Sequence, residues 1–158
     1  MKILVTGGAG FIGSHLVDAL VRSGHRVIVV DNLSTGYKNF VNPKAKFYRT
    51  DILSSKLERI FAKEKPEAVF HLAAQKSVPF SVVHPLEDLR INVLGSLKVI
   101  ENAVKQKAKK LVFMSTGGAI YGEDKFLPWS ENGPEKPISP YGLSKLTVDN
   151  YLANYYAK

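Results

Sequence analysis

The sequence contains no cysteine and has no apolar run long enough to cross a membrane. Its 158 residues can therefore form no disulfide and no thiolate metal site, which is compatible with a cytoplasmic location. No other metal site is predicted. A membrane-spanning helix needs about 18 or more consecutive apolar residues, so no membrane association is expected either. We also expect no signal peptide, because Met1 and Lys2 lead directly into a short strand pattern followed by glycines.

Acidic residues are fewer than basic ones, 14 against 22, which gives a net charge of +8. A basic chain raises the question of nucleic-acid binding. The lysines are scattered, however, and the one tight group (Lys105, Lys107, Lys109 and Lys110) lies at the end of a predicted helix, where cations suit the helix dipole. We therefore expect no nucleic-acid partner. With 45% hydrophobic residues, the chain has enough apolar material for the core of a single domain over residues 1–158.

Short apolar, β-branched runs alternate with segments of helical period along the chain. Strands are predicted at Ile3–Thr6, Arg26–Val30, Lys46–Arg49, Ala68–His71 and Lys110–Ser115. Helices are predicted at Phe11–Ser23, Ser55–Lys63, Pro85–Gln106 and Ser139–Ala157. This alternation indicates an α/β fold, a Rossmann-like doubly wound parallel sheet with helices on both faces. The irregular stretches 31–43, 74–84 and 117–138 follow strands, so they belong at the carboxyl edge, where open α/β sheets bind ligands.

Three glycines (Gly7, Gly10 and Gly13) stand between the first predicted strand and the first predicted helix. Glycines in such a turn permit a tight bend, let the backbone approach a pyrophosphate, and let the helix pack closely on the strand. The helix N-terminus then presents free N–H groups and a positive dipole end to phosphate. The spacing is G-x-x-G-x-x-G rather than the commoner G-x-G-x-x-G, and glycines alone also occur in purely structural loops.

Asp31 ends the second predicted strand, 18 residues after Gly13. A carboxylate at this place accepts hydrogen bonds from the adenosine-ribose hydroxyls and repels a 2′-phosphate, which favours NAD over NADP. The alternative is that Asp31 only caps a turn with Asn32. Together with the glycine turn, Asp31 predicts an NAD site.

Tyr141 and Lys145 lie near the start of the last predicted helix, four residues apart and therefore on one helix face. A tyrosine, whose pKa is ordinarily about 10, is a poor base at neutral pH. A neighbouring ammonium and a positively charged nicotinamide would lower the pKa of Tyr141 toward the working range, and lysine can also bond the nicotinamide ribose. The pair is informative only because it follows a dinucleotide-binding pattern.

Seven ordered motifs carry a resemblance to a known family over essentially the whole chain. They are Thr6–Gly13, 31–36 (DNLSTG), 51–52 (DI), 71–75 (HLAAQ), 92–95 (NVLG), 115–122 (STGGAIYG) and Tyr141–Lys145. In these the chain resembles the extended short-chain dehydrogenase/reductase family, and within it the NAD-dependent nucleotide-sugar epimerases of the UDP-glucose 4-epimerase type. The resemblance implies NAD as cofactor and a nucleotide sugar, most simply a UDP-sugar, as substrate. Hydride would pass from sugar carbon 4 to NAD and return to the other face of a 4-keto sugar.

The resemblance also implies a set of site residues. Cofactor contacts would come from Gly7, Gly10, Phe11, Ile12, Gly13, Asp31, Asn32, Leu33, Thr35, Gly36, Asp51, Ile52, Leu72, Ala73, Ala74, Lys76, Asn92, Tyr141 and Lys145. Asp51 and Ile52 would contact the adenine. The segment after the fourth strand would line the pyrophosphate and ribose, although its residues could simply end a buried strand. Asn92 would approach the cofactor from the long helix or serve as a polar residue at a helix interface.

One departure from the family concerns the catalytic hydroxyl. The family places a serine or threonine four residues before the tyrosine of its Tyr-Gly pair, and here that position is Gly117. We hypothesise that Thr116 supplies the hydroxyl instead, because the following glycines let the backbone shift. The alternatives are Ser115, or that Thr116 only caps the strand end. The dehydratases of this family carry an Asp-Glu pair just after their threonine, and Gly118 and Ala119 here disfavour elimination.

A second departure is length, since these enzymes run about twice as long and hold the sugar nucleotide largely with their C-terminal half. The chain is thus expected to lack most of that substrate domain, and a catalytically idle NAD-binding module is the alternative to an epimerase. Apolar residues also form a stripe on the long helix at Leu86, Leu89, Val93, Leu97, Ile100 and Val104. In the family the two long helices pair in a dimer, so a homodimer is the implied partner; core packing is the alternative.

Overall fold

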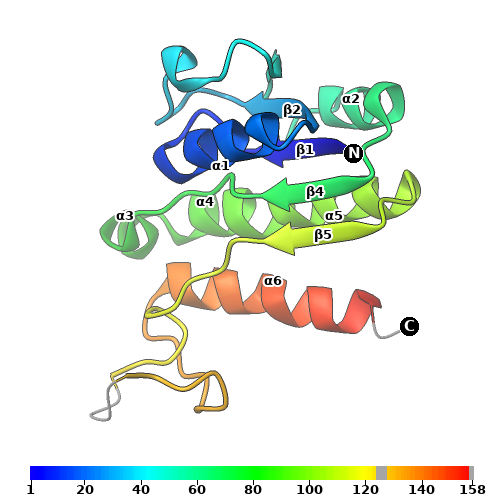
Figure 1. Cartoon of the computed structure of the whole chain (residues 1–158). Helices are drawn as coiled ribbons and strands as arrows, with labels where there is room; N and C mark the ends of the chain where they lie inside the picture. Colours follow the sequence, from blue (N-terminus) through cyan, green and yellow to red (C-terminus); the bar gives the residue numbers. More distant parts are fainter. Residues whose placement is uncertain (124–127, 157–158) are drawn as a thin grey trace. The chain divides into compact units, whose positions relative to one another are not determined.

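Figure 1 shows the computed structural model of the chain, in which residues 1–123 and 128–156 are described. The elements are β1 (Lys2–Thr6), α1 (Phe11–Arg22), β2 (Arg26–Asp31), η1 (Lys38–Phe40), β3 (Lys46–Arg49), α2 (Lys56–Glu64), β4 (Ala68–His71), α3 (Val78–Val83), α4 (Pro85–Leu89), η2 (Arg90–Leu94), α5 (Gly95–Lys105), β5 (Lys110–Phe113) and α6 (Pro140–Tyr156). They fall into two compact units. The first comprises Met1–Ala74 with Lys98–Met114, and the second Gln75–Leu97 with Ser115–Lys158.

The first unit is a parallel sheet of five strands in the order β3-β2-β1-β4-β5. Every neighbouring pair runs parallel, with Thr6 opposite Val30 on one side of β1 and opposite His71 on the other. The strand order reverses between β1 and β4, so the loops after these two strands diverge. In open α/β sheets this point at the carboxyl edge is where ligands bind.

Strand residues alternate between two cores, because side chains in a strand point to opposite faces in turn. Leu4, Ile28, Val30 and Val69 pack with apolar side chains of α2 and α5. Their neighbours Ile3, Val5, Val27 and Val29 pack with side chains of α1 on the other face. The doubly wound Rossmann-like fold predicted from the sequence is thus confirmed.

The second unit is helical and contains the start of the long helix together with α3 and α6, which pack against one another. The predicted helix Pro85–Gln106 is helical almost throughout, but its middle, η2, is a π-helical turn. Its buried residues in this unit are polar: Asp88, Asn92 and Ser96, each four residues apart. The predicted stripe is partly exposed instead, since Leu86 is 82% and Leu89 is 52% accessible. Core packing therefore does not account for these two leucines.

Two short elements were not predicted. The segment Val78–Val83 forms helix α3, which begins where the Ser77 hydroxyl accepts from Phe80 N at 3.2 Å and Pro79 occupies the first turn. Its valines favour strands, so propensity alone argues against this helix. The other is the 3₁₀ turn Lys38–Phe40. Boundaries differ slightly elsewhere: β5 ends at Phe113 instead of Ser115, and the predicted end of the last helix, Ala157, lies outside the described residues.

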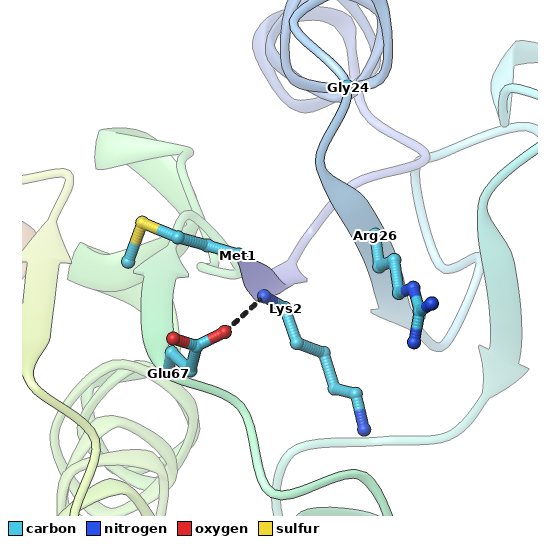
Figure 2. Close-up of a pocket in the computed structure, with 5 residues that line it drawn as sticks. All are labelled: Met1, Lys2, Gly24, Arg26 and Glu67. Atoms are coloured by element: carbon cyan, nitrogen blue, oxygen red, sulfur yellow. Dashed lines mark hydrogen bonds between the residues drawn. The ribbon is translucent and has the colours of Figure 1, made fainter.

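A hollow of about 290 Å³ lies at the amino ends of β1 and β2, lined by Met1, Lys2, Gly24, Arg26 and Glu67. Figure 2 shows the backbone N of Lys2 donating to Glu67, at 2.8 Å. This hollow is at the sheet edge opposite the glycine turn, so it is separate from the predicted cofactor site. Within 1–123 and 128–156, no helix is long and apolar enough to span a membrane.

Candidate cofactor and catalytic site

The turn that follows β1 has a backbone conformation and a close packing that side chains at its glycine positions would prevent. Gly7 has a φ of +72°, and its N–H donates to Val30 O at 2.9 Å. A Cβ on Gly7 would lie 2.7 Å from Ala73 N, and one on Gly13 would lie 2.1 Å from Gly7 O. Both neighbours are backbone atoms, which cannot move aside as a side chain can. These two glycines therefore let the turn pack closely against the segment that follows β4 and against the start of α1.

The turn presents the N-terminus of α1 without a competing acid. Gly10 is the N-cap, no side chain of the described residues caps the helix, and the first turn holds no acidic residue. The first N–H groups of a helix lack partners within it and carry the positive end of its dipole. Phe11 and Ile12, in this first turn, are 77% and 57% exposed although both are apolar. This arrangement fits the pyrophosphate of a dinucleotide.

Asp31 is buried at the end of β2 and braces the glycine turn. Its Oδ2 accepts from Ala9 N at 3.0 Å, and its Oδ1 accepts from Leu33 N at 2.8 Å. Each carboxylate oxygen can accept a further hydrogen bond, so both remain able to receive a ribose hydroxyl. Leu33 has a φ of +62°, a conformation that this contact helps to hold. Turn capping and ribose binding were the two alternatives for Asp31 from the sequence. The structure shows the turn contacts, and the carboxylate oxygens can still accept hydrogen bonds from a ribose.

The remaining adenosine-side candidates lie along the ends of β2 and β3. Asn32 Nδ2 donates to Asp51 Oδ2 at 2.8 Å, so these two candidates are joined at the carboxyl edge. Ile52 is 6% exposed and packs in the core beside α2, so its side chain faces away from solvent. Thr35 is exposed, while Gly36 lies against Ala9, whose carbonyl oxygen would be 2.7 Å from an added Cβ.

The segment after β4 is fixed to β1 through Thr6. Leu72 N donates to Thr6 O at 3.1 Å, and Ala73 N donates to the Thr6 hydroxyl at 3.3 Å. That hydroxyl also contacts His71 Nδ1 at 2.6 Å. Leu72, Ala73 and Ala74 are all half-buried, and the first two pack against the apolar cores. The glycine turn and this segment thus form one rigid edge of the first unit.

In the second unit, the structure brings Thr116 to Tyr141. The Thr116 side chain lies close enough to the Tyr141 hydroxyl to lower its pKa by side-chain hydrogen bonding. The approach depends on Gly142, where an added Cβ would lie 2.2 Å from Ala119 O. Tyr141 N also donates to the Ser81 hydroxyl at 3.1 Å, and Gly142 N to the Ser139 hydroxyl at 3.1 Å. A hydroxyl supplied by Thr116, as hypothesised from the sequence, is therefore in contact with the candidate base.

Lys145 lies one turn further along α6 and is 3% exposed. Burial lowers its pKa from 10.5 to about 8, although the carboxylates of Asp149 and Asp88 act in the opposite direction. Burial raises the pKa of Tyr141, and so does Asp88, while the hydrogen bond with Thr116 lowers it. The sequence predicted that Lys145 would lower the pKa of Tyr141. In this structure the net direction is upward, because burial outweighs the hydrogen bond.

Three other candidates of the second unit have defined surroundings. Asn92 is buried, with its Oδ1 accepting from Gln75 N and its Nδ2 donating to Gln75 O, each at 2.9 Å. Its amide therefore holds the backbone that follows β4. Ser115, the second candidate hydroxyl, donates instead to Asp149. Lys76 is exposed.

Two carboxylates near the pair were missed in the sequence. Asp88 is fully buried, and Asp149 is half-buried four residues after Lys145. Burial raises the pKa of Asp149, whereas Ser115 and Lys145 lower it. A signal was available for each: Asp88 precedes Asn92 by four residues and Asp149 follows Lys145 by four, so each pair shares a helix face.

The chain is similar to known epimerases over nearly all its length. It matches the NAD dependent epimerase/dehydratase family over residues 3–158. A UDP-glucose 4-epimerase of Lactobacillus helveticus is 45% identical over 154 residues, which cover 97% of this chain and 46% of that protein. The structure of a UDP-glucose 4-epimerase of Thermotoga maritima with UDP-glucose is 51% identical, with a TM-score of 0.97 over 100% of this chain and 52% of that one.

A UDP-glucose 4-epimerase of Thermus thermophilus in complex with NAD is 45% identical, with a TM-score of 0.95 over 98% of this chain and 50% of that one. The chain thus spans about half the length of the relatives it matches. The match includes the glycine turn, the sheet and the helix that bears Tyr141 and Lys145. The chain belongs to the NAD dependent epimerase/dehydratase family.

Proposed function

We propose that this chain binds NAD and takes part in the epimerisation of a nucleotide sugar at sugar carbon 4, with a UDP-sugar as substrate. The observation that carries the proposal is the contact of Thr116 with Tyr141, which shares a face of α6 with the buried Lys145, in a member of this family. The two similar structures with UDP-glucose and with NAD support the choice of substrate and cofactor.

The glycine turn and the N-terminus of α1 would hold the pyrophosphate, and Asp31 the adenosine ribose. NAD, when bound, supplies the positively charged ring that takes up a hydride from carbon 4 and returns it. Tyr141 takes the proton of the 4-hydroxyl and gives it back to the 4-keto sugar after that sugar has turned over. Thr116 donates to the same oxygen, and Lys145 favours the phenolate of Tyr141 as long as it is an ammonium.

A second candidate function is a catalytically idle NAD-binding module, for which the glycine turn, the N-terminus of α1 and Asp31 would suffice. Purified chain mixed with UDP-galactose and NAD separates the two. Formation of UDP-glucose supports the epimerase, whereas saturable NAD binding without any UDP-glucose supports the module. Absence of NAD binding contradicts both.

Replacing Thr116 with alanine is expected to lower turnover roughly 10- to 100-fold, since one hydrogen bond to a developing charge is worth about 1.5–3 kcal/mol. Thr116→Ser should retain most of the activity because the hydroxyl remains. Thr147→Ala is the matched control, because it removes a threonine hydroxyl of the same unit whose hydrogen bond goes to Leu143 O, and it should turn over normally. Initial rates of UDP-glucose formation measure all three. Equal rates for Thr116→Ala and wild type would assign Thr116 to strand capping.

Replacing Asp31 with serine is expected to weaken NAD binding and to reduce the preference for NAD over NADP, because the repulsion of a 2′-phosphate disappears. The chain should also lose about 1–3 kcal/mol of stability, since Ala9 N and Leu33 N lose their carboxylate acceptor. Calorimetric titration with both nucleotides gives the preference. Asp51→Asn removes the same charge at the end of the neighbouring strand, and it should leave the preference nearly unchanged. An unaltered preference in Asp31→Ser would reduce Asp31 to a turn cap.

We further propose a homodimer through the two long helices of the second unit. Leu86 and Leu89 on one helix, and Leu143 and Tyr151 on α6, are exposed, which supports a covering partner. Sedimentation equilibrium of the chain measures its mass in solution, and a monomer at high concentration would contradict the dimer. A cytoplasmic location stays a prediction from the cysteine-free sequence.

A further inference from the structure

Asp88, in the short helix α4, is a carboxylate with no accessible surface. Charged side chains are rarely buried unless a cation accompanies them. Asp88 Oδ1 accepts from Gln75 Nε2 at 2.8 Å and from Asn92 Nδ2 at 2.9 Å, and its Oδ2 accepts from Ser144 Oγ at 2.7 Å. All three donors are neutral, and within the described ranges no cation hydrogen-bonds to it. Its hydrogen bonds are therefore to neutral dipoles alone, and its charge interacts with Lys145 without a direct hydrogen bond.

These three contacts join separate parts of the second unit. Gln75 belongs to the segment that follows β4, Asn92 to the π-helical turn, and Ser144 to α6. Asn92 in turn binds both backbone polar atoms of Gln75. Ser144 precedes Lys145 directly, so its bond to Asp88 fixes the rotation of α6 at the residues that carry the proposed chemistry. One carboxylate thus holds three segments in register.

The charge of Asp88 interacts with both Tyr141 and Lys145. It raises the pKa of Lys145 against the effect of burial, and it raises the pKa of Tyr141. The elements α3, α4 and η2 pack on α6: α3 carries no titratable side chain, α4 contributes Asp88 and Glu87, and η2 contributes Arg90, which pairs with Glu87. On α6 itself Asp149 acts on Lys145, and Glu135, in the segment before α6, acts on Asp149. Because burial leaves the pKa of Lys145 at about 8, the ammonium form has little margin above neutral pH.

We propose that Asp88 is a positioning residue for the Tyr141–Lys145 pair, fixing α6 through Ser144 and adding a buried negative charge to that of Asp149 in keeping Lys145 an ammonium. The inference rests on the proposed function in one respect, namely that Tyr141 and Lys145 are the working pair. It adds a third residue, from another helix, on which the protonation state of that pair depends. It also gives the π-helical turn a role, since Asn92 in that turn is one of the donors that hold Asp88.

The variant Asp88→Asn removes the negative charge and keeps the hydrogen bonds, so it tests the two contributions of Asp88 separately. The amide oxygen can still accept from Gln75 and Asn92, and the Ser144 hydroxyl can rotate to accept from the new amide N–H. Glu87→Gln is the matched control, because it removes the same charge from the adjacent residue of α4, whose side chain is exposed and paired with Arg90. Ser144→Ala removes the tether and keeps the charge.

Two titrations of the 158-residue chain, without nucleotide or sugar, read out the result. The Cε signal of ¹³C-labelled Lys145, assigned with Lys145→Arg, gives the lysine pKa. Tyrosinate absorbance, taken as a difference against Tyr141→Phe, gives the tyrosine pKa. In Asp88→Asn we expect both ionisations at lower pH than in the wild type. In Glu87→Gln we expect no shift, and in Ser144→Ala a smaller one. Loss of local structure would act oppositely on Lys145, because exposure raises its pKa toward 10.5.

An unchanged or raised pKa of Lys145 in a folded Asp88→Asn overturns the inference. If that variant does not fold, wild-type chain with ¹³C-labelled aspartate decides: the Asp88 Cγ signal must respond to the ionisation of Lys145, and a flat signal overturns the inference as well. Because no cofactor or substrate is present, the titrations are independent of turnover. A chain that makes UDP-glucose but shows no shift rejects only the role of Asp88. A chain that shows the shift but makes no UDP-glucose rejects only the proposed activity.

Discussion

Tyr141→Phe is expected to lower epimerase turnover by about 10²- to 10⁴-fold, the range that a positioned general acid–base contributes. The substitution removes the one oxygen that, in the proposed reaction, takes and returns the proton of the sugar hydroxyl. The ring remains to fill the same space, and the backbone N–H keeps its bond to the Ser81 hydroxyl. NAD affinity should change little, because the glycine turn and Asp31 are untouched.

The measurement is the rate of UDP-glucose formation together with a separate NAD titration. Tyr151→Phe is the matched control: Tyr151 lies on the same helix and is 43% exposed, and loss of its hydroxyl alone keeps the ring on the proposed dimer surface, so the rate should stay unaltered. Turnover by Tyr141→Phe within a few-fold of the wild type would move the base elsewhere. Loss of both turnover and NAD binding, with a changed melting temperature, would indicate misfolding of α6 instead.

The pH profile of the wild type gives the same pair a second test. Lys145 has a pKa of about 8, lowered by burial, so the ammonium is lost as pH rises through that value. Turnover should therefore fall above about pH 8 even though the phenolate of Tyr141 becomes more abundant there. A rate that keeps rising well beyond this pH would mean that the charge of Lys145 is not needed.

Sequence reasoning recovered the sheet because buried parallel strands have a strong local signature. Lys46–Arg49 and Ala68–His71 match the predicted bounds fully, and β1 and β2 each differ by one residue. The glycine turn and Asp31 were found for the same reason, since one continuous segment contains the strand, the turn and the carboxylate. At Ser115 the local signal misled: its hydroxyl donates to Asp149 on α6, and the strand ends two residues earlier.

The buried polar residues of the second unit could not be predicted from local sequence patterns. Asp88 is buried because Ser144, 56 residues away, and Gln75 donate to it, and no periodicity in either segment announces those contacts. Taken as a core face, the leucine stripe predicts the wrong buried side in this unit, because Leu86 lies on the opposite side of the helix from Asp88 and is exposed. Hydrophobic periodicity identifies a core face only when that core is apolar. Here the buried face is polar, since it is formed by Asp88, Asn92 and Ser96.

Gly13→Ala is expected to cause the largest loss in the first unit, about 3 kcal/mol of stability or more, because overpacking against backbone cannot relax locally. The added Cβ would lie 2.1 Å from Gly7 O and 2.8 Å from Gly8 Cα. Relief requires α1 to move away from the turn, which spoils the approach of its N-terminus to a pyrophosphate. NAD affinity should fall at least about 100-fold, the equivalent of about 3 kcal/mol. Urea unfolding and calorimetric NAD titration measure the two losses.

Gly10→Ala distinguishes packing from phosphate contact. Gly10 has a φ of −80°, which alanine adopts readily, and its added Cβ would lie 3.3 Å from Gly7 O, a tight contact that a shift of a few tenths of an ångström relieves. Its unfolding midpoint should therefore stay close to that of the wild type. NAD binding should nevertheless weaken, because the methyl group stands at the helix N-cap, where the pyrophosphate is proposed to lie. If Gly10→Ala binds NAD as tightly as the wild type while Gly13→Ala does not, the turn serves to pack α1 and the phosphate contact lies elsewhere on the carboxyl edge.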